Sequence, residues 1–198
     1  MQESKTKQKI VDYATKKFFT IGFSKISTDQ MANELGMSKA TLYKYFPKKE
    51  VLLEEVVSHF AQEQLRDIER IASDAELEFR QKIERFMLAV GKRLSTVKQE
   101  AMQDIQRSVP EIYEQLMELR KNIILKKLSE LFQQGVYDGL FRKDLDQTFV
   151  VSVILAAIES LANPEFLSNS AHTYETVFQN ILTLILEGNM IRERNDGG

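Results

Sequence analysis

Lysines alternate with hydroxyl-bearing side chains in the segment MSKATLYKYFPKKE, residues 37–50. Within it, Lys39 and Lys44 flank Thr41 and Tyr43. Ammonium and hydroxyl groups donate hydrogen bonds to phosphate oxygens, and a long cationic side chain can also reach the edge of a guanine base. The alternative is that the tyrosines fill a hydrophobic core while the lysines form a solvated surface. The density of both residue types in so short a segment favours a surface that contacts phosphates and bases.

These side chains need a helix that is too short to be stable alone. Ser38 can cap its start, and Pro47 ends it, because the residue before a proline resists the helical conformation. So short a helix gains too few hydrogen bonds to offset the cost of nucleation, so tertiary packing must hold it. The residues spaced to form a shared core with a first helix, expected over about residues 4–22, are Met31, Ala32, Leu35, Met37, Leu42 and Phe46.

A second expected helix precedes this one at the distance of a tight turn. Thr28 is placed to cap its start, and Gly36 is placed to end it. Two helices joined by a tight turn form the helix-turn-helix pattern. In such a unit the second helix lies in the major groove of DNA, with its N-terminal residues toward the base edges.

The segment STDQMANELGMSKATLYKYFPKKEVL, residues 27–52, resembles the DNA-binding signature of the TetR (tetracycline-repressor-like) family of transcriptional regulators. The upstream pattern AxxxFxxxGF, residues 14–23, is similar to the first helix of that family. Two positions depart from the family pattern: Ala40 stands where glycine is common, and Lys48 stands where a small capping residue is common. The resemblance covers about residues 10–53 and implies an N-terminal three-helix helix-turn-helix domain.

The resemblance also implies roles for individual side chains. Its phosphate contacts fall on Thr28, Ser38, Tyr45 and Lys49. Its base contacts, or contacts to base and phosphate together, fall on Lys39, Thr41, Tyr43 and Lys44. We predict that these side chains bind a double-stranded DNA operator.

Charge is divided unevenly along the chain. Residues 1–49 hold ten lysines and four acidic residues, a net charge of +6, whereas residues 50–198 hold 17 basic and 25 acidic residues, a net charge of −8. A basic end on an acidic body is typical of a polyanion-binding module attached to a part with another task, although charge alone fits a solvated lysine-rich face equally well.

The chain has no cysteine, which excludes disulfides and thiolate metal sites and fits a cytoplasmic protein. The apolar segment 149–158 is shorter than the roughly 20 residues that span a bilayer.

Helical periodicity continues beyond the signature and strand patterns are nearly absent, so the expected fold is all-α. We expect a helix-turn-helix DNA-binding domain over residues 1–50 and a helical-bundle domain for effector binding and dimerisation over residues 51–198. The helices expected after the signature cover about residues 48–63, 75–97, 99–107, 110–135, 146–162 and 171–187.

The helices at 146–162 and 171–187 are expected to form a homodimer interface. The segment TFVVSVILAAIESLA is apolar nearly all round, which predicts burial on more than one side. Asp144 or Asp146 is placed to cap it. Small side chains would let a partner helix approach closely, and members of the resembled family usually dimerise through their last two long helices. The alternative is that both helices belong only to the core of one protomer.

The ligand pocket of the resembled family lies among the middle helices, so the resemblance implies a small-molecule effector. Few charged residues are expected to be buried there, and this favours a mostly apolar effector; no cofactor or metal is expected. Glu159 interrupts an apolar run and is a ligand contact, a dimer contact or a solvated carboxylate. The predicted effector-binding residues are Met87, Val90, Met102, Gln103, Ile105, Gln106, Tyr113, Met117, Phe149 and Glu159.

Two other classes of function compete with this interpretation. An enzyme is disfavoured because the chain has only two histidines, no cysteine and no glycine-rich phosphate loop. A helical scaffolding protein would bind no effector, so its DNA binding would not respond to a small molecule. We predict a ligand-responsive repressor that binds an inverted-repeat operator as a dimer and that a small, mostly apolar effector releases.

Overall fold

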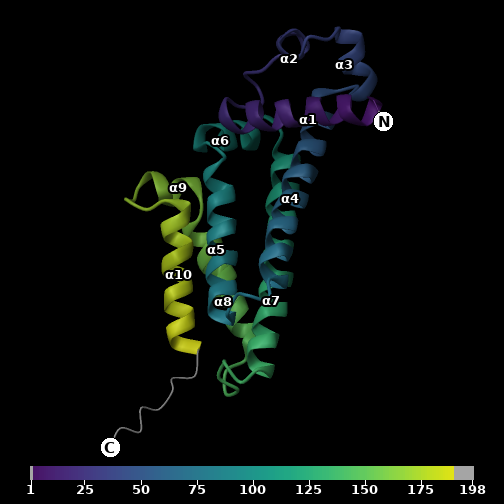
Figure 1. The fold of residues 1–198 in the computed structure, drawn as a ribbon. Coiled ribbons are helices and arrows are strands. Elements are labelled where there is room, and N and C mark those ends of the chain that lie inside the picture. Colours follow the sequence, from purple (N-terminus) through teal and green to yellow (C-terminus); the bar gives the residue numbers. More distant parts are fainter. Residues whose placement is uncertain (1, 190–198) are drawn as a thin grey trace, which may run out of the picture. The chain divides into compact units, whose positions relative to one another are not determined.

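The computed structural model describes residues 2–189 of the chain (Figure 1). No β-strand occurs within this range, so the predicted all-α fold is confirmed. The helices are α1 (Gln2–Thr20), α2 (Thr28–Leu35), α3 (Lys39–Tyr45), α4 (Lys49–Ser73), α5 (Phe79–Ser95), α6 (Gln99–Ser108), α7 (Pro110–Tyr137), α8 (Gln147–Leu161), α9 (Pro164–Ser168) and α10 (Tyr174–Asn189).

Most of the predicted helices agree with these bounds to within four residues. The exception is α4, which ends at Ser73, ten residues beyond the predicted end near residue 63. Three further points concern helix starts and a short helix. The N-cap of α2 is Ser27 instead of the predicted Thr28, because Ser27 has the extended backbone and its hydroxyl accepts from the Gln30 N–H. Asp146 caps α8, which decides between the two candidates. The short helix α9 was not predicted; Asn163 caps it.

The helices pack into two compact units. The N-terminal unit comprises the residues up to 66 together with residues 95–120, and the C-terminal unit comprises residues 67–94 and those from 121 onward. Each unit has its own hydrophobic core, and helices α4 and α7 are divided between the two. This division follows packing and not function, so the functional boundary expected at residue 50 stays a prediction.

The core of the N-terminal unit holds α2 and α3 against α1 (Figure 1). Ile10, Ala14 and Phe18 form the buried face of α1. From α3 and its C-cap, Leu42 and Phe46 reach this core, which is the tertiary support that so short a helix requires. The predicted shared core is confirmed, with Met37 only partly buried.

In the C-terminal unit, α8 packs against α10. The buried face of α8 carries Val150, Val151, Ile154, Leu155 and Ile158. Ala157 and Leu161 are partly buried against the same core, and the opposite side of the helix is exposed. The predicted burial on more than one side is therefore not found within a single chain. The exposed residues of α8 include Phe149, Ser152, Val153, Ala156 and Ser160.

A close approach in the same unit involves Gly135 on α7. A Cβ atom at this position would lie 2.6 Å from Cζ of Phe79 and 2.9 Å from Cδ2 of Phe141. These two rings pack edge to face at 5.3 Å. Glycine is therefore needed at residue 135 for steric reasons.

None of the helices between residues 2 and 189 is long and apolar enough to cross a bilayer.

Candidate functional site

The turn between α2 and α3 is fixed by glycine. Gly36 has φ 67° and ψ 38°, the left-handed conformation that ends many helices. Its N–H donates to the Asn33 carbonyl at 3.1 Å, and the Met37 N–H donates to the Ala32 carbonyl at 2.9 Å. These two bonds satisfy carbonyls that the end of α2 leaves free, so the chain turns sharply and α3 can begin three residues later.

The start of α3 is fixed by Ser38. Its backbone is extended, with φ −74° and ψ 153°, and its Oγ accepts from the Thr41 N–H at 3.1 Å. The hydroxyl oxygens of Ser38 and Thr41 also lie 2.9 Å apart. The predicted cap is confirmed. Because both hydroxyls are used locally, the N-terminal turn of α3 is held in one geometry before any partner binds.

The outward face of α3 carries the predicted side chains. Lys39 and Lys44 are exposed, and Thr41 is half-buried. Tyr43 is 43% exposed, and its hydroxyl lies 3.0 Å from Oγ1 of Thr28, so it is not a core residue. Tyr45 is half-buried and packs partly against the core of the N-terminal unit. The alternative of a purely structural role therefore survives in part for Tyr45 and fails for Tyr43.

Both lysines of α3 form ion pairs within the N-terminal unit. Nζ of Lys39 lies 2.6 Å from Oδ2 of Asp29, and Nζ of Lys44 lies 2.9 Å from Oε1 of Glu3. The hydrogen bond from Lys44 lowers the pKa of Glu3, and the same bond raises the pKa of Lys44. Exposed pairs of this kind contribute little stability, so a phosphate group can displace either carboxylate at small cost.

Lys49, at the start of α4, faces inward more than the resemblance implied. It is half-buried, its ammonium group donates to the Phe23 carbonyl, and it lies 4.2 Å from the centroid of the Phe23 ring. Burial lowers the pKa of Lys49, and the charges of Asp104 and Glu50 oppose that change. Lys49 therefore supports the loop before α2 in addition to its predicted phosphate contact.

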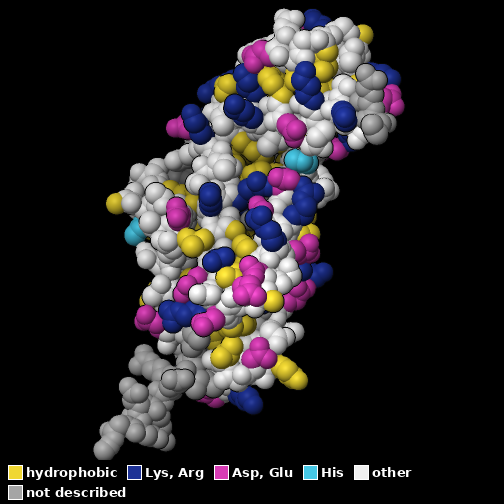
Figure 2. Space-filling model, viewed as in Figure 1, with side chains coloured by type: hydrophobic (Ala, Val, Ile, Leu, Met, Phe, Trp, Pro, Cys, Tyr) yellow, Lys and Arg dark blue, Asp and Glu magenta, His cyan; other side chains and the backbone are white. Residues whose placement is uncertain are grey.

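On the face seen in Figure 2, lysines are the main charged side chains over helices α1 to α3, which contain no arginine. This agrees with the net charge of +6 that the sequence assigns to residues 1–49. Exposed lysines and hydroxyls on one helix, with excess positive charge around them, form a surface suited to a phosphate backbone.

The predicted effector-binding residues are spread over both units. Those in the N-terminal unit are Met102, Gln103, Ile105, Gln106, Tyr113 and Met117, and those in the C-terminal unit are Met87, Val90, Phe149 and Glu159. The buried members are Met87, Val90, Met102 and Ile105; Tyr113 and Met117 are half-buried, and Gln103, Gln106, Phe149 and Glu159 are exposed.

Two members of this set lie on the surface for identifiable reasons. Phe149 is 67% exposed on the open face of α8. Glu159 forms an ion pair with Lys121, with 2.8 Å between Oε1 and Nζ, so the solvated-carboxylate alternative fits it within this chain. The effector-binding set as a whole stays a prediction.

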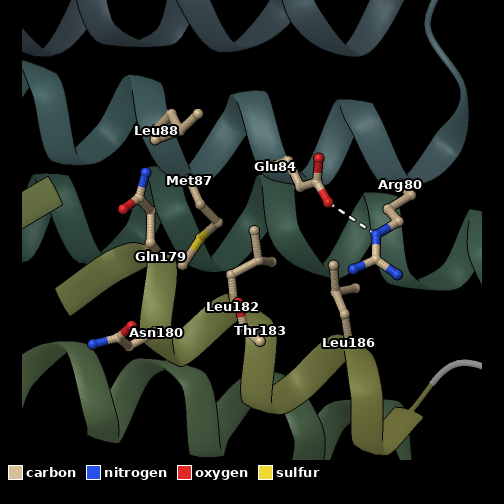
Figure 3. A pocket seen from close by; sticks show the side chains of 9 residues that line it. All are labelled: Arg80, Glu84, Met87, Leu88, Gln179, Asn180, Leu182, Thr183 and Leu186. Atoms are coloured by element: carbon tan, nitrogen blue, oxygen red, sulfur yellow. Dashed lines mark hydrogen bonds and ion pairs between the residues drawn. The ribbon is translucent and has the colours of Figure 1, made fainter. Parts of the chain in front are cut away.

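A described pocket of about 400 Å³ lies between α5 and α10 (Figure 3). Of the predicted effector-binding residues, Met87 lines it, together with Leu182 and Leu186. Arg80 and Glu84 form an ion pair, with 2.9 Å between Nε and Oε1, at one end of the pocket. The remaining lining residues are Leu88, Gln179, Asn180 and Thr183.

Sequence reasoning missed Gln64 on α4. Its side chain is only 2% exposed, yet neither amide atom has a hydrogen-bond partner among residues 2–189. Buried polar groups without a partner are rare in folded proteins and need an explanation. A glutamine inside a long helix looks like a surface residue in sequence, so nothing in the sequence distinguished it.

No group of three or more His, Asp or Glu side chains in the described range is placed to hold a metal ion.

Comparison with known proteins agrees with this geometry. The family described as "Bacterial regulatory proteins, tetR family" matches residues 10–56. The uncharacterized HTH-type transcriptional regulator YvaF of Bacillus subtilis is 25% identical, over 88% of this chain and 90% of that protein. The fatty acid metabolism regulator protein of B. subtilis is 21% identical, over 90% of this chain and 93% of that protein.

Among solved structures, a putative transcriptional regulator from Saccharomonospora viridis in complex with choline has the same fold, with a TM-score of 0.75 at 17% identity, over 96% of this chain and all of that one. Helix-turn-helix geometry, basic surface and comparisons together define a DNA-binding transcriptional regulator and not an enzyme. The match to the tetR family over residues 10–56 falls on the segment that carries the signature identified in the sequence.

Proposed function

We propose that the protein is a dimeric repressor that binds an inverted-repeat operator through α3. The observation that carries this proposal is the capped and packed α3, which leaves Lys39 and Lys44 exposed and Thr41 half-buried. In this proposal those three side chains contact base edges. Lys39 and Thr41 lie in the N-terminal part of the recognition helix, which is directed toward the base edges, and Lys44 reaches a base from the last turn with its long side chain. Phosphate contacts fall on Thr28, Ser38, Tyr45 and Lys49, and Tyr43 contributes from the rim of the same face.

The dimer forms through the open face of α8 together with α10. Phe149 and Val153 are exposed there beside the small side chains of Ser152, Ala156 and Ser160. On α10, Leu184 is 75% exposed. Exposed apolar and small residues at helical spacing favour close packing against a copy of the same two helices, and a two-fold axis makes such an interface self-complementary. A two-fold dimer in turn requires a two-fold operator.

The effector is a small, mostly apolar molecule that binds among the middle helices and releases DNA. Within residues 2–189 the buried polar or charged side chains are Gln64, Asp104 and Arg120, so little buried charge is available for a highly ionic ligand. Methionines such as Met87 and Met102 can repack around different apolar shapes. One B. subtilis relative is named a fatty acid metabolism regulator protein, so a fatty acid is a suitable first probe for an apolar effector. Gln64 would supply the polar contact, since a free amide can both donate and accept a hydrogen bond.

The DNA-binding proposal is tested by selecting bound sequences from random DNA and footprinting the winners. The expected site is an inverted repeat with half-sites about one helical turn, roughly 34 Å, or a multiple of it, apart. Enrichment of a single half-site without symmetry contradicts the dimeric mode. Finding the selected sequence upstream of the protein's own gene would then indicate that the protein controls its own promoter.

The effector proposal is tested by titrating a fluorescent long-chain fatty acid into the protein with and without operator. To reverse a 99:1 population of the DNA-binding state, the ligand must prefer the released state by roughly 10⁴-fold, about 5.5 kcal/mol. Linkage requires the operator to weaken ligand binding by the same factor. Identical affinities in the two titrations mean that the ligand does not control DNA binding.

A further inference from the structure

A buried carboxylate on α6 contacts the loop that joins α1 to α2. Asp104 is only 6% exposed, and its Oδ2 accepts from the Ser24 N–H at 2.7 Å. Its Oδ1 accepts from the Ser24 hydroxyl. A buried charge is costly unless it is paired and hydrogen-bonded, so an aspartate at this position indicates a specific role for the contact.

Asp104 also packs closely against Gly22, two residues before Ser24 in the same loop. Gly22 has φ 121°, and a Cβ atom there would lie 2.9 Å from Oδ2 of Asp104. The residue before α6 adds a backbone tie, because the Lys98 N–H donates to the Phe19 carbonyl at 2.8 Å. Helix α6 and the end of α1 are therefore interlocked within the N-terminal unit, and α6 cannot shift without disturbing the loop.

The loop also carries the elements that face DNA in the proposed function. Phe23, next to Ser24, accepts the hydrogen bond from Lys49 at the start of α4. Ser27, three residues after Ser24, caps α2, and Ile26 between them is buried in the core. A displacement of Ser24 is therefore transmitted over very few bonds to Lys49 and to the start of α2.

The charge of Asp104 strengthens its hold on the loop. Burial by itself would raise the pKa of this carboxyl, but the two hydrogen bonds from Ser24 and the positive charges of Lys25 and Arg107 outweigh burial, and the pKa is lowered. The ionised carboxylate offers an acceptor oxygen to each Ser24 donor. An asparagine of the same shape offers only one acceptor and presents an N–H₂ group at the other position.

We propose that Asp104 is the positioning residue that holds the 21–27 loop, and with it α2 and Lys49, in the arrangement that binds the operator. Movement of α6 by an effector breaks the contact with Ser24 and so releases DNA. This inference rests on the proposed DNA-binding function and adds the side chain through which α6 acts on it.

The test compares Asp104→Asn with Glu100→Gln, which removes the same charge from an exposed position of the same helix. Each full-length variant is titrated with the operator duplex that the wild-type protein selects and with a scrambled duplex of equal length. We expect Asp104→Asn to bind the operator about tenfold more weakly, the size expected for a lost charged hydrogen bond. Affinity for the scrambled duplex should fall several-fold less than affinity for the operator, because the phosphate-binding side chains are retained and only displaced, whereas base contacts require the exact arrangement. Glu100→Gln should match the wild-type protein on both duplexes.

Two results overturn the proposal. One is wild-type operator affinity in Asp104→Asn; the other is an equal loss on both duplexes accompanied by a lower melting temperature, which assigns Asp104 a purely structural role. If Asp104→Asn does not fold, Ser24→Ala gives the same comparison, since it removes one of the two hydrogen bonds. A loss that is greater on the operator than on the scrambled duplex then supports the proposal, and no loss contradicts it. A wild-type protein that selects no sequence overturns the proposed function itself, which is established before any variant is made.

Discussion

Replacing Ser38 tests whether the geometry of α3 controls DNA binding. Ser38→Ala removes the oxygen that accepts from the Thr41 N–H, and α3 has only seven residues with which to compensate. Loss of an N-cap costs about 1 kcal/mol, and a helix this short frays readily at its first turn. Because a dimer presents two copies of α3, restoring both on DNA costs about 2 kcal/mol, which corresponds to a roughly 30-fold loss of operator affinity.

Two further substitutions separate capping from direct contact. Ser38→Asn keeps an acceptor of comparable capping strength without a charge, so its stability should match that of the wild-type protein. Ser38→Asp also caps and suits the positive end of the helix dipole, but it places a negative charge against the DNA phosphates. We therefore expect Ser38→Asp to fold normally and to lose operator binding almost completely.

The assays are urea unfolding at one fixed protein concentration, because a dimer's stability depends on concentration, and operator titration at one fixed salt concentration. Normal stability and normal affinity in Ser38→Ala would refute the argument that the cap organises α3. If Ser38→Asn restores stability without restoring affinity, the hydroxyl itself contacts DNA. If it restores both, Ser38 acts through helix geometry alone.

Three further predictions concern the DNA-facing surface, the dimer and the C-terminal core. Lys44→Ala should weaken cognate DNA more than scrambled DNA, whereas Lys49→Ala should weaken both alike and lower the salt slope by about one; equal losses for Lys44→Ala over a salt series would reassign it to the backbone. Phe149→Glu should convert the dimer to a monomer, because it buries a charge in the α8 interface. The control Glu165→Gln, at an exposed position nearby in sequence, should leave the dimer intact. Light scattering distinguishes dimer from monomer, and a dimer in both variants would place the interface elsewhere. Gly135→Ala should destabilise the C-terminal unit by about 1–3 kcal/mol, because the methyl group meets the rings of Phe79 and Phe141. The control is Gly188→Ala, at a helical glycine of α10 where nothing lies within 4 Å of the added atom. Equal melting temperatures for the two variants would show that the rings move aside.

The sequence alone determined the helix-turn-helix because each of its boundaries is set by local chemistry. Ser38, Gly36 and Pro47 act through backbone groups only a few residues away, so their effect can be predicted without tertiary structure. The same holds for the spacing of the apolar residues that hold α3, since that spacing follows from helical periodicity. At the start of α2 the prediction of Thr28 as the cap was wrong, because two adjacent hydroxyl side chains can each cap a helix and only the backbone conformation selects Ser27.

The tertiary structure alone decided which partner each charged or polar side chain meets. Lys44 pairs with Glu3, and Asp104 binds Ser24, across long stretches of sequence, and no local pattern encodes such distances. The inward position of Lys49 and the burial of Gln64 likewise depend on which faces of α4 the other helices cover. For α8 the sequence shows an apolar segment but not which of its sides is buried, and only packing against α10 left Phe149 on the open side. Burial is a property of neighbours brought together by folding, so it becomes definite only when those neighbours are in place.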